Sequence, residues 1–180
     1  MHHHLIMEKI KNTNSPFLRK DDKELLKNLT DYLTQKKNTL STAESCTGGY
    51  LSHLFTSIPG SSAYFKGGVI AYANEIKERI LLVPKEILLT DGAVSENTVF
   101  LMAKNCKKTL QTDYAIAVSG IAGPDGGTIE KPVGTVWIAI ASNKKVHTQL
   151  FRFGNMTRKE IIYQSAFQAI KLLTNIIENE

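Results

Sequence analysis

The spacing of apolar and polar residues predicts an alternation of helices and strands along the chain. Between residues 21 and 36, apolar side chains recur every three or four positions, which is typical of an amphipathic helix. The same period marks residues 95–110 and the segment after Thr157, and residues 48–55 fit a shorter helix. Short apolar runs predict strands at residues 39–42, 69–72, 114–118, 135–141 and 146–153.

A further helix is predicted from Asn74, taken as its N-cap, to Leu82, with another helical turn after Pro84. Helices that alternate with strands in this way favour a layered α/β domain with a mixed sheet. One such domain accounts for residues 21–180, whereas residues 1–20 are polar and irregular and are expected to form a flexible arm.

The composition narrows the class of protein. A hydrophobic content of 42% and a charged content of 22% are those of an ordinary globular domain. The net charge of +5 is not gathered into a block of like charges, which weighs against direct nucleic-acid binding. The sequence has neither a secretory apolar segment nor an apolar run long enough to span a membrane, so a cytoplasmic location without a membrane partner is expected.

Histidine and cysteine are scarce outside the amino terminus. His2, His3 and His4 resemble an expression remnant, which leaves His53 and His147 for any chemistry. A serine hydrolase usually needs a histidine base, so either the fold places one of these two or another base is used. The two cysteines, Cys46 and Cys106, cannot build a disulfide framework or a metal site on their own.

The first candidate for chemistry is Ser45, in the stretch Ala43–Gly49 between a predicted strand and a predicted helix. A serine at such a turn can present its hydroxyl as a nucleophile, or it can cap the helix, a role that Thr47 could also take. Cys46 is a rival nucleophile, although a cysteine at this place is more often a packing residue. The stretch does not match a phosphate-binding P-loop.

The second candidate is Lys77, in the first turn of the helix predicted after Tyr72. The positive end of a helix disfavours a cation and lowers the pKa of a lysine there, which is what a lysine base requires. The alternative is a surface lysine paired with Glu75 or Glu78.

The third candidate is the glycine-rich segment 120–134, which follows a buried strand. Glycines let a backbone approach a ligand and offer amides to an anion, and sites in α/β proteins gather at such strand ends. The alternative is a plain flexible loop.

Together these motifs resemble the CinA carboxy-terminal domain family, whose characterised activity is that of a nicotinamide-nucleotide amidase (PncC-type). The resemblance covers residues 21–178 and rests on residues 43–49, 60–65, 68–77, 92–95, 119–127 and 131–137. It implies a three-layer α/β/α sandwich with a mixed sheet. Larger members carry an additional amino-terminal nucleotide-hydrolysing domain.

The resemblance also implies roles for individual residues. Ser45 falls on the nucleophile, Lys77 on its base and Tyr72 on an assisting tyrosine. No metal or organic cofactor is implied. The expected substrate-binding residues, which would offer amides, a carboxylate and a guanidinium, are Thr47, Gly48, Gly49, Ser119, Gly120, Gly123, Asp125, Gly126 and Arg158.

The implied reaction converts nicotinamide mononucleotide and water to nicotinate mononucleotide and ammonia, and a homo-oligomer, a dimer, is the expected assembly. Two alternatives stay open: an amidase for a related substrate, and a non-catalytic interaction protein of the competence and DNA-damage operons that give the family its name. The segment 154–158 is two residues longer than the Gly-Asp-Arg of many members. Ile162 stands where a second arginine is expected, so Arg158 would supply the single guanidinium.

Overall fold

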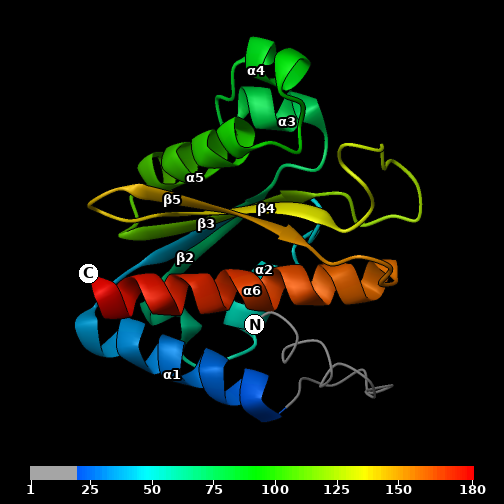
Figure 1. Cartoon of the computed structure of the whole chain (residues 1–180). Coiled ribbons are helices and arrows are strands. Elements are labelled where there is room, and N and C mark those ends of the chain that lie inside the picture. Colours follow the sequence, from blue (N-terminus) through cyan, green and yellow to red (C-terminus); the bar gives the residue numbers. More distant parts are fainter. Residues whose placement is uncertain (1–19) are drawn as a thin grey trace.

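In the computed structural model, which describes residues 20–180, one five-stranded sheet lies between two layers of helices (Figure 1). The strand order is β2-β1-β3-β4-β5; β1 runs parallel to β2 and β3, and the pairs β3–β4 and β4–β5 are antiparallel. This confirms the expected three-layer α/β/α fold with a mixed sheet. The strands are β1 (Leu40–Glu44), β2 (Phe65–Ile70), β3 (Tyr114–Gly120), β4 (Thr135–Ala141) and β5 (Val146–Arg152).

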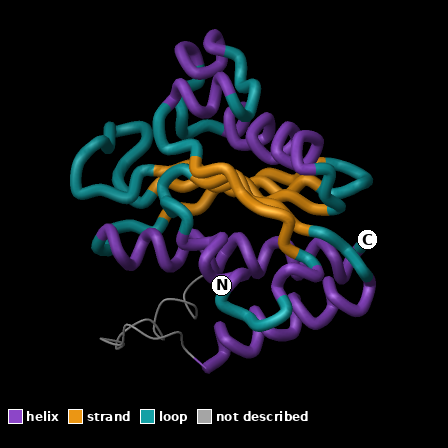
Figure 2. The backbone as a smooth tube through the Cα atoms, turned by 180° about the vertical axis from the view of Figure 1, so that it is seen from behind, coloured by secondary structure: helices purple, strands orange, loops and turns teal. Residues whose placement is uncertain are grey.

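The helices divide between the two faces of the sheet, as both views show (Figures 1 and 2). One layer holds α1 (Lys20–Lys36), α2 (Tyr50–Thr56) and α6 (Arg158–Asn179). The other holds α3 (Asn74–Arg79), α4 (Lys85–Thr90) and α5 (Glu96–Leu110). A single 3-10 turn, Ser61–Ala63, leads into β2. The predicted flexible arm lies outside the described residues, apart from Lys20 at the start of α1.

The alternation of residue size along β3 and β4 decides how each layer packs. Neighbouring residues of a strand point to opposite faces of the sheet. In β3, Ile116 and Val118 join the core under α1, α2 and α6, whereas Ala115 and Ala117 face α5. Strand β4 repeats this pattern, with isoleucines on the first face and alanines on the second. Small side chains let α5 approach the sheet closely, and the branched residues fill the opposite core.

The predicted boundaries of β2 and α3 differ from those in the structure. Strand β2 runs from Phe65 to Ile70, so it begins four residues earlier and ends two residues earlier than predicted. The early start is not visible in the sequence because Lys66–Gly68 interrupts the apolar pattern. Asn74 is the first residue of α3 and not its N-cap, a position that Ala73 takes, and α3 ends at Arg79.

Helix α2 also begins later than predicted. Gly48 and Gly49 have φ values of 58° and 97°, in the left-handed region. Glycine adopts this region without strain, whereas a right-handed helix cannot include it, so the helix starts at Tyr50. The two glycines instead form the turn that joins β1 to α2.

The parallel strands β1, β2 and β3 bring their carboxyl ends to one edge of the sheet. The Ser45 amide, just beyond β1, donates to the Val118 carbonyl at 2.9 Å. The Ala71 amide, just beyond β2, donates to the Glu44 carbonyl at 2.7 Å. The chain segments that leave the three strands are therefore held side by side at the edge where α/β proteins place ligands.

Candidate active site

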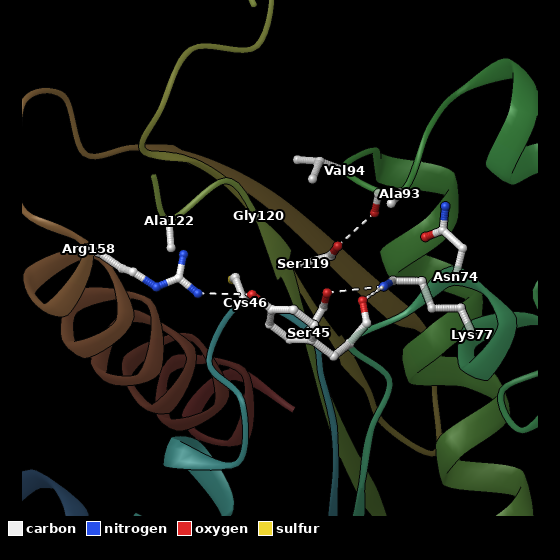
Figure 3. A pocket seen from close by; sticks show the side chains of 11 residues that line it. Ser45, Cys46, Asn74, Lys77, Ala93, Val94, Ser119, Gly120, Ala122 and Arg158 are labelled. Carbon is white, nitrogen blue, oxygen red and sulfur yellow. Dashed lines mark hydrogen bonds between the residues drawn. The ribbon is translucent and has the colours of Figure 1, made fainter. Parts of the chain in front are cut away.

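Ser45 is the first residue after β1, and its hydroxyl faces Lys77 (Figure 3). Lys77 Nζ lies 3.1 Å from Ser45 Oγ. Ser45 does not cap α2, because Gly49 occupies the N-cap position and makes no side-chain cap. The capping alternative is therefore wrong for Ser45. It is wrong for Thr47 as well, whose buried hydroxyl has no hydrogen-bond partner among the described residues.

Lys77 is buried, with a relative solvent exposure of 1% for the whole residue. Its Nζ contacts three oxygens: Ser45 Oγ at 3.1 Å, the Ala71 carbonyl at 2.7 Å and the Tyr72 carbonyl at 3.3 Å. Burial lowers the pKa of Lys77, since removal from water disfavours the charged amine, and nearby Cys46 opposes this to a smaller extent. Within residues 20–180 no carboxylate pairs with this amine, so the alternative of a surface lysine is wrong.

The three contacts suit a neutral lysine acting as a base. A neutral amine has two N–H bonds and one lone pair. If the carbonyls of Ala71 and Tyr72 accept the two N–H bonds, the lone pair is left for the hydroxyl proton of Ser45. A serine and a desolvated lysine in this geometry can act as a nucleophile and its general base. Neither His53 nor His147 lines the same cavity.

Cys46 does not compete for the role of nucleophile. Burial raises the pKa of its thiol to about 12, helped by Glu44, whereas its own backbone amide, Lys77 and Arg158 lower it by less. The thiolate is the reactive form of cysteine, so a thiol that stays protonated at neutral pH is unreactive. This agrees with the interpretation of Cys46 as a packing residue.

Glu44 holds the turn that carries Ser45. Its carboxylate is fully buried and accepts hydrogen bonds from the amides of Gly49 (3.0 Å), Leu51 (3.1 Å) and Ser52 (2.8 Å), and from the Ser52 hydroxyl (2.5 Å). These are the amides that a helix leaves unpaired at its start, and an anion there is favoured by the helix dipole. The carboxylate thus fixes the entry into α2.

The amides of the Ser45 turn are only partly available to a ligand. Gly48 donates to the Ser45 carbonyl at 3.1 Å, and Gly49 donates to Glu44. The two glycine amides predicted to bind substrate are therefore occupied. The amides of Cys46 and Thr47 donate to no oxygen atom of residues 20–180, and of these two residues Cys46 lines the cavity. The Cys46 amide, next to the Ser45 hydroxyl, is the better placed donor for a developing oxyanion.

Ser45 and Lys77 line a cavity of about 220 Å³. We call it the Ser45 pocket. Its lining residues come from all three strand ends and from α3, α6 and the α4–α5 connection: Ser45, Cys46, Tyr72, Asn74, Lys77, Ala93, Val94, Ser119, Gly120, Ala122 and Arg158.

The pocket includes some of the predicted substrate-binding residues and leaves out others. Ser119, Gly120 and Arg158 line it. Those that do not are Thr47, Gly48, Gly49, Gly123, Asp125 and Gly126. Of the second group, Asp125 and Gly126 are exposed in the loop between β3 and β4, whereas the Gly123 carbonyl accepts a hydrogen bond from Arg158 at 2.7 Å.

Tyr72 and Arg158 meet at the rim of the pocket. Tyr72 is 60% exposed, and its hydroxyl accepts a hydrogen bond from Arg158 Nη2 at 2.9 Å. The hydroxyl makes no bond with Ser45 or Lys77, so the contact of Tyr72 with this pair is through its backbone carbonyl. Tyr72 lies beyond the end of β2, in the connection before α3.

The longer segment 154–158 still brings Arg158 to the pocket. Thr157 caps α6 through a reciprocal capping box with Glu160, which fixes the start of the helix. Arg158 is the first helical residue and faces Gly123 and Tyr72. Ile162, one turn later, packs against the core beneath α6 and adds no polar group to the pocket.

Four lining residues were not predicted individually as site residues, namely Asn74, Ala93, Val94 and Ala122, although Ala122 lies within the predicted segment 120–134. The Ser119 hydroxyl donates to the Ala93 carbonyl at 2.7 Å and so ties the α4–α5 connection to the end of β3. This contact depends on the tertiary structure and has no local sequence signal. For Asn74 the sequence does contain a local signal. It lies three residues before Lys77, and residues at this spacing share a helix face.

The fold and the site define an α/β/α protein with a buried serine–lysine pair at the carboxyl edge of its parallel strands. The family model of the CinA C-terminal domain matches residues 22–177, and the chain belongs to this family. It is 50% identical over 141 residues to a CinA-like protein of Cytophaga hutchinsonii, covering 78% of this chain and 34% of that protein. With a CinA-like protein of Prochlorococcus marinus it shares 46% over 160 residues, covering 88% and 37%.

The chain thus spans about a third of the length of these curated relatives. Solved structures match it over nearly their whole length. The competence/damage inducible protein CihA from Agrobacterium tumefaciens superposes with a TM-score of 0.86 at 37% identity, covering 92% of this chain and all of that one. A CinA superfamily protein from Escherichia coli gives a TM-score of 0.83 at 28% identity, covering 89% and 94%.

No helix within residues 20–180 is long and apolar enough to cross a membrane. In the same part of the chain, no group of three or more His, Cys, Asp or Glu side chains could hold a metal ion.

Proposed function

We propose that this chain is an amidohydrolase that converts nicotinamide mononucleotide and water to nicotinate mononucleotide and ammonia. The observation that carries the proposal is the 3.1 Å contact between Lys77 Nζ and Ser45 Oγ in a buried site. The substrate comes from the sequence resemblance to nicotinamide-nucleotide amidases. The relatives matched above are described by family and by competence, and those descriptions state no reaction.

The proposed reaction proceeds in two steps. Neutral Lys77 takes the hydroxyl proton of Ser45, whose oxygen attacks the carboxamide carbon, while the Cys46 amide stabilises the oxyanion. Lys77 then gives the proton to the departing nitrogen and the C–N bond breaks. Ammonia departs, and the acyl group remains bound to Ser45 as an ester. Water hydrolyses this ester in the second step, with Lys77 again as the base and Ser45 as the leaving group.

Arg158 supports the proposal that the substrate carries a phosphate. Two of its five N–H bonds go to Gly123 and Tyr72, which leaves three for a further acceptor at the rim of the pocket. A guanidinium anchored in this way is suited to a phosphate, which accepts charge-assisted hydrogen bonds. The Ser45 pocket would then hold the carboxamide while Arg158 holds the distant phosphate.

Ammonia release by the whole chain, measured in parallel on nicotinamide mononucleotide, nicotinamide and glutamine, tests the function. We expect release from the mononucleotide, none from Ser45→Ala or Lys77→Met, and nearly full release from the matched control Cys46→Ala. Circular dichroism of each variant verifies that the fold is kept. Release from glutamine or nicotinamide in preference to the mononucleotide would assign a related amidase. No release from any of the three would instead favour a non-catalytic interaction protein.

A further inference from the structure

Asn74 has no role in the reaction above, and its polar side chain in the Ser45 pocket has no hydrogen-bond partner within residues 20–180. Each other polar side chain of the lining has a partner: Ser45 with Lys77, Ser119 with Ala93, and Arg158 with Tyr72. The carboxamide of Asn74 makes no hydrogen bond with any described residue and is exposed at the pocket. An amide group with a donor and an acceptor both unused is thus available to a ligand.

The position of Asn74 relative to Ser45 indicates which part of a substrate it would meet. Asn74 begins α3, and Lys77 follows it by one turn on the same face. In Figure 3, Lys77 and Asn74 lie on one side of Ser45, and Cys46 and Arg158 lie on the other. A carboxamide attacked by Ser45 with its oxygen at the Cys46 amide therefore turns its nitrogen toward α3.

We propose that Asn74 selects the scissile carboxamide by accepting a hydrogen bond from its NH₂ group through Oδ1. This assignment rests on the proposed function and deepens it. The hydrogen bond orients the nitrogen so that its developing lone pair faces Lys77, which holds the proton taken from Ser45. When the C–N bond breaks, that proton moves from Lys77 to the nitrogen, and ammonia leaves with the charges balanced.

The assignment predicts a preference for amides over esters of the same acid. A methyl ester of nicotinate mononucleotide has no N–H at the leaving atom and offers nothing to Asn74 Oδ1. Loss of a single neutral hydrogen bond corresponds to about a five- to tenfold change in a rate or binding constant. Asn74→Ala should therefore lower kcat/KM about five- to tenfold on the amide and less than twofold on the ester.

Asn74→Asp separates recognition from packing. A carboxylate still accepts from the NH₂ group, so this variant should keep the preference for the amide over the ester. It also places a negative charge one turn from Lys77, which favours the charged amine. The acidic limb of its pH–rate profile should therefore move to higher pH whatever the role of Asn74, whereas the preference for the amide should survive only if residue 74 accepts from the NH₂ group.

The experiment measures kcat/KM on the mononucleotide and on its methyl ester for the wild-type protein, Asn74→Ala and Asn74→Asp. Glu75→Ala, the next residue of α3 and not part of the pocket lining, is the matched control and should change neither value. Equal losses on both substrates in Asn74→Ala, or no loss, would overturn the assignment of Asn74 alone. A wild-type protein that releases no ammonia would contradict the proposed function and this assignment together.

Discussion

Replacing Glu44 by glutamine tests whether its carboxylate holds the Ser45 turn. The side chain keeps its shape, but one oxygen becomes an NH₂ group that must face a donor. The glutamine should turn this group toward Ser52, because the Ser52 hydroxyl can rotate to accept it and donate instead to Thr42 Oγ1, 2.7 Å away. Only the Ser52 amide, now 2.8 Å from Glu44 Oε1, then loses its acceptor.

The size of the effect follows from these contacts. A buried amide without an acceptor costs about 1–3 kcal/mol. The bonds from Gly49 and Leu51 change from charge-assisted, worth about 1.5–3 kcal/mol each, to neutral, worth about 0.5–1.5 kcal/mol. Glutamine also removes the cost of burying a charge, which offsets part of the loss. We expect the free energy of unfolding to fall by about 3 kcal/mol, or about 6–12 °C in Tm for a domain of this size.

Chemical denaturation of wild-type protein, Glu44→Gln and Ser52→Ala measures this loss. Ser52→Ala is the matched control, since it removes one hydroxyl and keeps the three amide bonds to the carboxylate; its expected cost is about 1 kcal/mol. Glu44→Gln should also lower kcat more than it raises KM, because it displaces Ser45 and not the phosphate site. If the free energy of unfolding of Glu44→Gln lies within about 1 kcal/mol of the wild-type value, the carboxylate does not hold the Ser45 turn.

Three further perturbations have defined outcomes. Because burial lowers the pKa of Lys77 below 10.5, kcat/KM should rise with pH on an acidic limb below that value. The contribution of neutral Lys77 to the free energy of unfolding is complete above pH 10.5, the ordinary pKa of lysine, and is lost as pH falls through the lower pKa of the folded state. Denaturation measured across this pH range should show the loss in the wild-type protein and not in Lys77→Met. Arg158→Ala should lower kcat/KM about ten- to hundredfold on the mononucleotide, mainly through KM, and less on the riboside; equal losses would show that Arg158 does not bind phosphate. Gly120→Ala would place a Cβ 2.5 Å from Val136 Cγ2, and calorimetry should find a lower Tm.

The local pattern of the sequence was sufficient for the layered fold and for most of its elements. The helical period of α1, α5 and α6 and the hairpin of β4 and β5 are visible in single segments of the chain. The apolar pattern places the start of β2 too late, because on this half-exposed edge strand Lys66 and Gly67 interrupt the apolar run. Its boundary depends on pairing with β1, which no local pattern reports.

The site was less accessible to sequence reasoning. The resemblance to the family predicts that Ser45 and Lys77 act as a pair. The position of Lys77 in its helix does not decide this, because it is equally compatible with a surface lysine. Burial of Lys77 arises from the end of β2 and the Ser45 turn, which are distant in sequence. The hydrogen bond from the Gly49 amide to Glu44 is likewise a tertiary contact, and the Gly48 amide is occupied by the Ser45 carbonyl. The two glycine amides expected to bind substrate are therefore occupied, and the Cys46 amide is the one left for an oxyanion.

The ester on Ser45 is the most direct evidence that could be sought for the proposed reaction. Turnover of nicotinamide mononucleotide would be quenched rapidly with acid, and the peptides would be mapped by mass spectrometry. The proposed Ser45–Lys77 mechanism predicts an acyl adduct on Ser45 in the wild-type protein and in Cys46→Ala, and none in Ser45→Ala. An adduct on Cys46, or turnover by Ser45→Ala at the wild-type rate, would contradict it.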